Sequence, residues 1–180
     1  QAFDASVGSG HVFLRDGFGS VDPEAILSDI RFMTMAKGVT WVILDHLSIL
    51  LSGNDSGDER KLIDVTMTKL RSLVERTGIA MFLVSHLRRT SNDTNHEEGA
   101  RVTLGQLRGS AAIAQLSDGV IALERDQQAD RGASRTTVRV LKNRYSGEVG
   151  VACHLTYDLD TCKFNEDACD EHEFDPSTDF

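Results

Sequence analysis

Two polar residues follow short apolar runs, and both positions suit nucleotide chemistry. Asp45 closes the run at 39–44, and His86 comes two residues after the run at 79–84. Such runs predict buried strands of a parallel sheet, and ligands collect at the carboxyl ends of these strands. Asp45 is therefore a candidate Mg²⁺ ligand that acts through water, because Mg²⁺ dehydrates reluctantly. His86 is a candidate phosphate sensor, a side chain that contacts a terminal phosphate and moves when it leaves.

Each of these two residues also has a purely structural interpretation. Asp45 can cap a loop at a strand end, and a single histidine after an apolar strand is more often structural than functional. The usual partner of such an aspartate is a phosphate-binding loop, Gly-x-x-x-x-Gly-Lys-Ser/Thr. This pattern does not occur in the 180 residues, and the first residue is not Met. We therefore expect a fragment of a longer nucleotide-driven protein that does not hydrolyse nucleotide alone.

Two basic segments suit contacts with a nucleic-acid backbone. Arg88 and Arg89 open a polar stretch at 88–102 that lacks periodicity, and long loops of this kind are often functional. Arg108, Gly109 and Ser110 precede a short predicted helix, where backbone amides attract phosphate. The alternative is a solvated surface with incidental charge.

Lys142 and Arg144 lie where a predicted strand enters a turn. An arginine at such a turn can reach out of its own subunit, as an arginine finger does to stabilise charge on a transferring phosphoryl group. On the residues alone, a basic hairpin tip at the surface is the simpler interpretation.

The elements that must position these residues alternate between helix and strand, which predicts an α/β fold with a parallel sheet. Asp22 and Pro23 predict the start of a helix that Gly38 ends. An apolar stripe predicts a second helix over 58–77, ended by Gly78. Strands are expected at 12–16, 39–44, 79–84, 120–124, 136–141 and 150–157, the last two as a hairpin, with a short helix around 111–116.

Charge is distributed unevenly along the chain. The net charge is −9, but residues 165–180 hold seven acidic residues and no Lys or Arg, which leaves 21 acidic and 19 basic residues elsewhere. This composition predicts a domain at 1–164 followed by a disordered acidic tail at 165–180. No apolar run is long enough to span a bilayer, so no membrane contact is expected. The three cysteines read as free thiols of a reducing compartment, and a metal site of Cys162, Cys169 and His172 is a minor alternative.

Together these segments resemble the ATPase domain of hexameric replicative DNA helicases of the DnaB-like group, most of all the helicase domain of helicase-primases from short-tailed T-odd bacteriophages. The resemblance runs from about residue 12 to residue 157, and the acidic tail closing on Asp179-Phe180 matches as well. The matching segments are Trp41-Val-Ile-Leu-Asp-His-Leu-Ser48, Asp58-Glu-Arg-Lys61, Leu83-Val-Ser-His-Leu87, His96-Glu-Glu-Gly99, Leu107-Arg-Gly-Ser110, Gln115-Leu-Ser-Asp118, Ile121-Ala-Leu-Glu-Arg125 and Leu141-Lys-Asn-Arg144.

The resemblance implies a RecA-like P-loop NTPase core with a mostly parallel sheet and a C-terminal hairpin, from which the phosphate-loop portion is missing. It implies a homo-hexameric ring that binds Mg²⁺ with ATP or dTTP, translocates on single-stranded DNA and unwinds duplex DNA. It also implies a cytoplasmic location in a phage-infected bacterial host, and docking of the replicative DNA polymerase on the tail that ends at Asp179-Phe180.

The resemblance assigns a role to each candidate residue. Asp45 matches the magnesium site and His86 the phosphate sensor, while Gln115 matches a glutamine that links nucleotide state to the DNA loops. Arg144 matches the arginine finger, with Lys142 beside it. The residues that flank the nucleotide base are Arg125 and Tyr157, and the DNA loops are the segments near 88–96 and 108–110, which include Arg88, Arg89, Arg108, Gly109 and Ser110. The phage proteins have a Lys-rich loop where this chain has Arg88 and Arg89, and either residue type serves a backbone contact.

Two other functions stay open on the sequence. One is a RecA-type recombinase or clock-type ATPase, which shares the core but does not unwind DNA. The other is a non-catalytic binding module that recruits a basic partner through the acidic tail.

Overall fold

A computed structural model of the chain describes residues 2–5, 7–15, 22–47, 59–87, 99–107, 111–127 and 135–167. The five residues predicted to bind DNA, Arg88, Arg89, Arg108, Gly109 and Ser110, lie outside these ranges. So do Cys169, His172 and the rest of the acidic tail from residue 168 to Phe180.

The helix α2, Pro23–Lys37, begins and ends where the sequence predicts. Asp22 caps it: Oδ1 of its side chain accepts a hydrogen bond from the backbone N–H of Glu24 at 3.1 Å. Pro23 occupies the first turn, where its missing N–H costs no hydrogen bond. Gly38 ends the helix in the left-handed conformation, with φ +68°, which a residue without Cβ adopts without strain.

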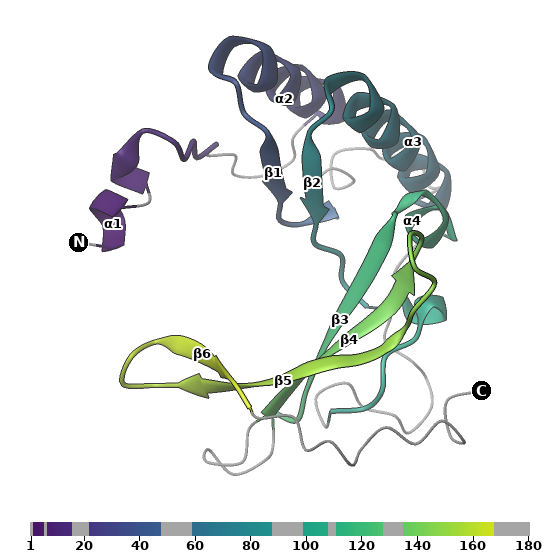
Figure 1. Ribbon diagram of the computed structural model, residues 1–180. Coiled ribbons are helices and arrows are strands. Elements are labelled where there is room, and N and C mark those ends of the chain that lie inside the picture. The colour runs from purple at the N-terminus through teal and green to yellow at the C-terminus, as the bar shows by residue number, and fades with distance from the viewer. Residues whose placement is uncertain are drawn as a thin grey trace.

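A two-stranded parallel sheet lies against α2 and the longer helix α3, Glu59–Thr77 (Figure 1). Its strands are β1, Trp41–Leu44, and β2, Ala80–Leu83, paired in register from Trp41 with Ala80 to Leu44 with Leu83. Alternate strand residues point towards the helices, and the most buried residue of the resulting core is Ile63 of α3. The buried members of this core are Ile26, Leu27, Ile30, Leu47, Ile63, Met67, Leu70, Leu73, Ile79 and Ile113.

The opposite face of the parallel sheet is uncovered by the described chain. Trp41 and Ile43 of β1 are 66% and 75% exposed, and Phe82 of β2 is 51% exposed. The rings of Trp41 and Phe82 stack on this face, with centroids 5.6 Å apart. The prediction of buried strands is therefore confirmed for one face only.

A separate four-stranded antiparallel sheet follows, in the order β3-β4-β5-β6. Its strands are β3, Gly119–Arg125, β4, Arg135–Asn143, β5, Gly150–Asp158, and β6, Lys163–Glu166. The predicted hairpin is confirmed as β4 and β5. The expectation of a mostly parallel sheet is wrong for the described strands, because β3 pairs with β4 rather than with β1 or β2.

The remaining elements are short. The helix α4, Ala111–Leu116, confirms the predicted short helix. The chain also has the helix α1, Ala2–Ala5, and 3₁₀ turns at Val7–Ser9 and Leu104–Gln106. Residues 12–15 form no strand, which corrects the prediction for 12–16.

The predicted boundary between domain and tail, at 164/165, lies inside β6. Asp167 still belongs to the sheet, because its backbone N–H donates to the carbonyl of His154 at 2.9 Å. Its carboxylate accepts from the hydroxyl of Thr156 at 2.8 Å and pairs with Arg135 at 2.9 Å. The folded domain therefore extends at least to residue 167.

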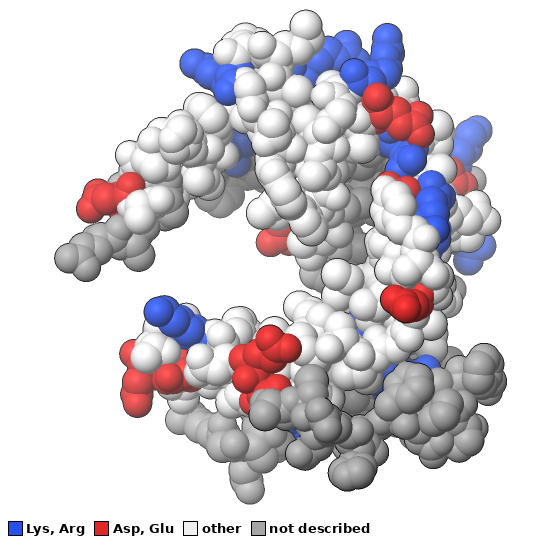
Figure 2. Space-filling model, in the orientation of Figure 1, with Lys and Arg blue, Asp and Glu red and all other residues white. Residues whose placement is uncertain are grey.

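The molecule is hollowed between the two sheets (Figure 2). The surface of this hollow is mostly neither acidic nor basic, whereas Lys and Arg gather over α2 and α3. Among the helices that the structure describes, none is long and apolar enough to cross a membrane.

Candidate nucleotide and DNA site

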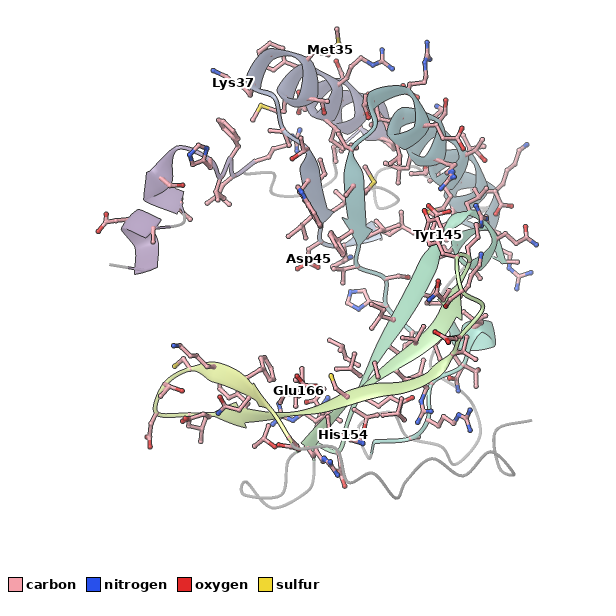
Figure 3. All side chains as sticks on the ribbon, in the orientation of Figure 1. Met35, Lys37, Asp45, Tyr145, His154 and Glu166 are labelled. Atoms are coloured by element: carbon pink, nitrogen blue, oxygen red, sulfur yellow. The ribbon has the colours of Figure 1, made fainter. Side chains whose placement is uncertain are left out.

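The carboxyl ends of β1 and β2 bring two predicted site residues to one edge of the parallel sheet. Backbone hydrogen bonds continue past the strands, from Val84 to the carbonyl of Leu44 and from Leu47 to the carbonyl of Val84, both at 3.0 Å. Asp45 and His86 follow the strands at this edge, and both residues are exposed. Figure 3 shows Asp45 at the end of β1 nearer the four-stranded sheet.

His46 joins the two strand ends, a contact that the sequence did not predict. Its ring meets the ring of His86 edge to face, with centroids 4.2 Å apart and planes at 63°. The Nδ1 atom of His46 is buried and has no hydrogen-bond partner among the residues that the structure describes. The predicted sensor, His86, is therefore in contact with His46, the residue directly after the predicted magnesium ligand Asp45.

Asp45, at this edge of the sheet, carries the kind of oxygen ligand that Mg²⁺ takes in proteins. No group of three His, Cys, Asp or Glu side chains that could hold a metal lies in the described part of the chain. Mg²⁺ commonly keeps several waters and takes one or two carboxylates plus substrate phosphates, and the exposed Asp45 supplies such a carboxylate. When bound there, Mg²⁺ would neutralise charge on the phosphate oxygens.

Lys142, at the end of β4, caps the carboxyl end of α4. Its ammonium donates to the carbonyl oxygens of Ala114 at 2.5 Å, Ser117 at 2.8 Å and Gln115 at 3.3 Å. A cation at this position complements the unpaired carbonyls that end a helix. The predicted nucleotide-binding lysine is thus turned towards α4 in this structure.

Arg144 lies beside Lys142 and contacts the same helix end. Its Nη2 donates to the carbonyl of Gln115 at 2.9 Å, and its Nη1 pairs with Asp118 at 2.9 Å. The other carboxylate oxygen of Asp118 accepts from Arg71 of α3 at 2.6 Å. That hydrogen bond is the main reason why the pKa of Arg71 is raised, followed by a second one to Glu75. The structure therefore brings Gln115, Lys142 and Arg144 together, as members of one cluster.

This cluster and the sheet edge are separate places on the chain. Figure 3 shows Asp45 at the end of β1, whereas Tyr145, the neighbour of Arg144, lies at the turn after β4 next to α4. In the described part of the chain, no hydrogen bond or ion pair joins Asp45 or His86 to Lys142 or Arg144. Within one copy of this chain, Asp45 and the turn that carries Tyr145 thus lie at different places.

The described residues that precede the two predicted DNA segments pair with each other. Leu87 and Leu107 form an isolated antiparallel bridge, and they are the residues that directly precede Arg88 and Arg108. His86 comes immediately before this bridge, and α4 with Gln115 follows the second segment. His86 is thus adjacent in the chain to the bridge between the residues that precede the two predicted segments.

A largely buried ion pair holds the residues that follow the first predicted DNA segment in the chain. Glu124 of β3 and Arg139 of β4 pair at 3.0 Å, with side chains only 5% and 14% exposed. Glu124 also accepts a hydrogen bond from the backbone N–H of Val102 at 2.7 Å. No role was predicted for Glu124, although a glutamate inside an otherwise apolar strand is the signal for such a pair.

Arg125 and Tyr157 share one face of the antiparallel sheet. Arg125 lies opposite Thr136, and Thr136 lies opposite Leu155, two residues before Tyr157. Strand residues two apart point to the same face, so both predicted base-flanking residues are on it. Tyr157 packs against the ring of Phe164, with centroids 5.0 Å apart, and a hydrogen bond with Cys162 raises the pKa of its hydroxyl.

Comparison with known proteins identifies the family of this chain. The family described as "DnaB-like helicase C terminal domain" matches residues 6–166, which is most of the chain. The chain belongs to this family. Its members are ATPase domains of replicative helicases, so the chain is homologous to a nucleotide-hydrolysing domain. A curated relative, the DNA helicase/primase of Enterobacteria phage T3, is 38% identical over 159 residues; the match covers 88% of this chain and 28% of that protein. The chain thus spans little more than a quarter of that relative.

Solved structures share the fold at lower identity. A structure described as an ATPase domain matches with a TM-score of 0.68 and 22% identity, over 85% of this chain and 54% of that one. A DnaB-like replicative helicase, described with its interactions with primase, matches with a TM-score of 0.65 and 21% identity, over 83% and 36%. A KaiC-like protein of Pyrococcus horikoshii matches with a TM-score of 0.62 and 14% identity, over 92% and 64%. The RecA-like α/β fold is therefore shared by helicase and KaiC-like ATPases.

Proposed function

We propose that this chain is the part of a helicase motor that holds the magnesium-side residue, the phosphate sensor and the arginine finger. The complete protein would hydrolyse ATP or dTTP with Mg²⁺, and a homo-hexameric ring would use this hydrolysis to move along single-stranded DNA and unwind duplex DNA. The observation that carries the proposal is the bridge between Leu87 and Leu107, which links the sensor His86 to both predicted DNA segments.

The sensor acts through this short link. His86 would contact the terminal phosphate, and the edge-to-face contact with His46 restricts the positions of its ring. Loss of the phosphate would shift His86, and the shift would reach Arg88 and Arg89 through the paired Leu87. Gln115, whose carbonyl contacts Arg144, would carry the state of the neighbouring site to α4 and the segment at 108–110.

The finger serves the nucleotide of a neighbouring subunit. Figure 3 shows Asp45 apart from Tyr145, the neighbour of Arg144, and the guanidinium of Arg144 binds Asp118 and Gln115 rather than Asp45, which supports a site built from two copies of the protein. In a head-to-tail ring each copy meets its neighbour through two different surfaces. One copy would supply Asp45 and His86, and the next would supply Arg144 to stabilise charge on the transferring phosphoryl group. Arg125 and Tyr157 would lie beside the base.

The exposure of one face of the parallel sheet favours the proposal that this chain is part of a larger domain. Parallel sheets occur almost only with both faces covered, and Trp41, Ile43 and Phe82 are exposed here. The part of the ATPase domain that carries the phosphate-binding loop would pack on this face in the complete protein.

Strand displacement on forked DNA tests the proposal. The complete protein, with Mg²⁺ and ATP or dTTP, should displace a strand from a fork with single-stranded arms and not from a blunt duplex. The Asp45→Asn variant is the matched control and should bind the fork without displacing a strand. Strand pairing or exchange without displacement would instead indicate a RecA-type recombinase.

The acidic tail is proposed to dock the replicative DNA polymerase through its end at Asp179-Phe180. Because Glu166 belongs to β6 and Asp167 pairs with Arg135, a deletion should begin at residue 168. Removal of 168–180 should abolish polymerase association and preserve hydrolysis. Unchanged association would leave the tail as a solubilising extension.

A further inference from the structure

Arg144, at the turn after β4, is held by three hydrogen bonds to Asp118 and Gln115. Its backbone N–H donates to the carbonyl of Asp118 at 2.8 Å. Its guanidinium donates to the carboxylate of Asp118 and to the carbonyl of Gln115, both at 2.9 Å. These side-chain contacts occupy two of the five N–H donors of a guanidinium, so Arg144 keeps donors for another anion while it is held.

Asp118 is itself anchored to a rigid element. Arg71 of α3 donates to its second oxygen at 2.6 Å, and Glu75, one turn later, accepts from Nε of Arg71 at 2.8 Å. The turn of α3 that carries Arg71 is packed into the core through Leu70 and Leu73, which are 3% and 4% exposed. The pKa of the Arg71 guanidinium is raised mainly by its hydrogen bond to Asp118, so Arg71 stays charged.

The shared carboxylate has a second consequence. Two guanidinium groups meet at Asp118, one on each oxygen. If Arg144 turns away towards a phosphate, Asp118 keeps its bond to Arg71 and is not left as an unpaired charge, which would be costly in a partly buried position. A single carboxylate therefore both holds Arg144 and permits its release.

We infer that Asp118 is the positioning residue of Arg144. Asp118, which is itself bound by Arg71, holds the finger arginine at the carboxyl end of α4, where it contacts Gln115. Asp118 itself touches no nucleotide and acts only through Arg144. The inference rests on the proposed role of Arg144 as the finger, and it adds a residue to which the resemblance assigns no role.

The test compares Asp118→Asn with Arg144→Ala in the complete protein, by the kinetics of DNA-stimulated nucleotide hydrolysis. Asp118→Asn keeps the shape of the side chain and removes its charge. Because a small misplacement of a positioned group is costly, its kcat should fall about 10-fold to 100-fold while KM changes less than about twofold. Glu75→Gln is the matched control: it removes the other partner of Arg71, and its kcat should stay within about twofold of the original protein.

The double variant decides whether Asp118 acts through Arg144. If it does, Asp118→Asn combined with Arg144→Ala should be no slower than Arg144→Ala alone. Multiplied losses would show an independent role and overturn the inference. If Asp118→Asn hydrolyses nucleotide normally while Arg144→Ala does not, the inference about Asp118 is wrong, but the proposed finger role of Arg144 stands. Normal hydrolysis by Arg144→Ala would instead refute the finger role and with it the proposed function.

Asp118→Glu covers the case in which Asp118→Asn does not fold. It keeps the charge and moves the carboxylate by one methylene, so an intermediate kcat is expected, again with no further loss when combined with Arg144→Ala. A kcat equal to that of the original protein, or a loss that multiplies with that of Arg144→Ala, would overturn the inference.

Discussion

At the scale of single residues, the proposed coupling depends on the position of His86. The residue follows β2, contacts the ring of His46 and precedes the bridge to Leu107. In the proposed mechanism, His86 would contact the phosphate, and its neighbour Leu87 would pass the change on through the bridge to Leu107. A substitution there should affect coupling more than binding.

We predict that His86→Ala uncouples hydrolysis from DNA. The stimulation of hydrolysis by single-stranded DNA should fall about 5-fold to 150-fold, the usual range of a coupling free energy between two sites. Nucleotide affinity should stay within about twofold, because the remaining contacts persist. Hydrolysis rates with and without DNA, together with equilibrium nucleotide binding, measure both quantities.

Ser85→Ala is the control, because it changes the preceding residue and leaves the ring contact in place. A variant at His86 that keeps full stimulation by DNA would remove the sensor role.

The sequence predicted some of these residues and missed others for a physical reason. Asp45 and His86 were predictable because each follows an apolar run, a local pattern. Asp118 and His46 were not, because their roles depend on partners brought together by the fold: Arg71 is 47 residues from Asp118, and His46 meets His86 only through the pairing of β1 with β2.

At the scale of elements, the antiparallel sheet holds the described residues that follow the first segment proposed to contact DNA. Glu124 of β3 binds both Arg139 of β4 and the backbone of Val102. Val102 is 3% exposed, so the segment at 99–107 is packed onto the sheet. Loosening this contact should loosen the end of the first DNA segment.

We predict that Glu124→Gln destabilises the ATPase domain by about 3 kcal/mol, because it leaves the nearly buried Arg139 without its charged partner. Urea unfolding of the complete domain measures the loss. Hydrogen exchange at the amide of Val102 should accelerate more than exchange in α3.

Asp29→Asn provides the comparison, since it breaks an exposed ion pair with Arg15 and should cost no more than about 1 kcal/mol. Equal losses of unfolding free energy in the two variants would show that the pair of Glu124 and Arg139 stabilises the domain no more than an exposed ion pair does.

Helices were more predictable than sheets in this chain. The N-cap Asp22, Pro23 and the terminating Gly38 are adjacent to the helix they define, so α2 was predicted from local residues alone. β3 pairs with β4 across the intervening residues 128–134. The sequence of β3 alone would fit a strand of the parallel sheet equally well, so this pairing was not predictable from local residues. Residues 12–15 carry β-forming side chains, but they have no neighbouring strand in the described chain.

At the scale of the whole molecule, one apolar face of the parallel sheet is left uncovered by the described chain. Ile43 is 75% exposed at the centre of this face, next to the stacked pair of Trp41 and Phe82. If the rest of the domain packs there, the exposure of Ile43 in this chain does not reflect its environment in the complete protein.

We predict that Ile43→Glu destabilises the complete ATPase domain by at least about 3 kcal/mol, because it would bury an unpaired charge. Val65→Glu is the matched control, since Val65 of α3 is also exposed, at 43%, and lies away from this face. Its cost should stay within about 0.5 kcal/mol. Urea unfolding again measures both, and equal tolerance of the two changes would mean that the face stays open to solvent.

The central claim is that Asp45 and Arg144 serve one nucleotide from two different subunits. The most direct measurement is nucleotide hydrolysis by an equimolar mixture of the Asp45→Ala and Arg144→Ala variants of the complete protein, after subunit exchange. Each variant alone should be inactive. In mixed rings about a quarter of the interfaces would combine an intact Asp45 with an intact neighbouring Arg144, so hydrolysis should return in the mixture. A mixture that stays as inactive as its two components would contradict the claim.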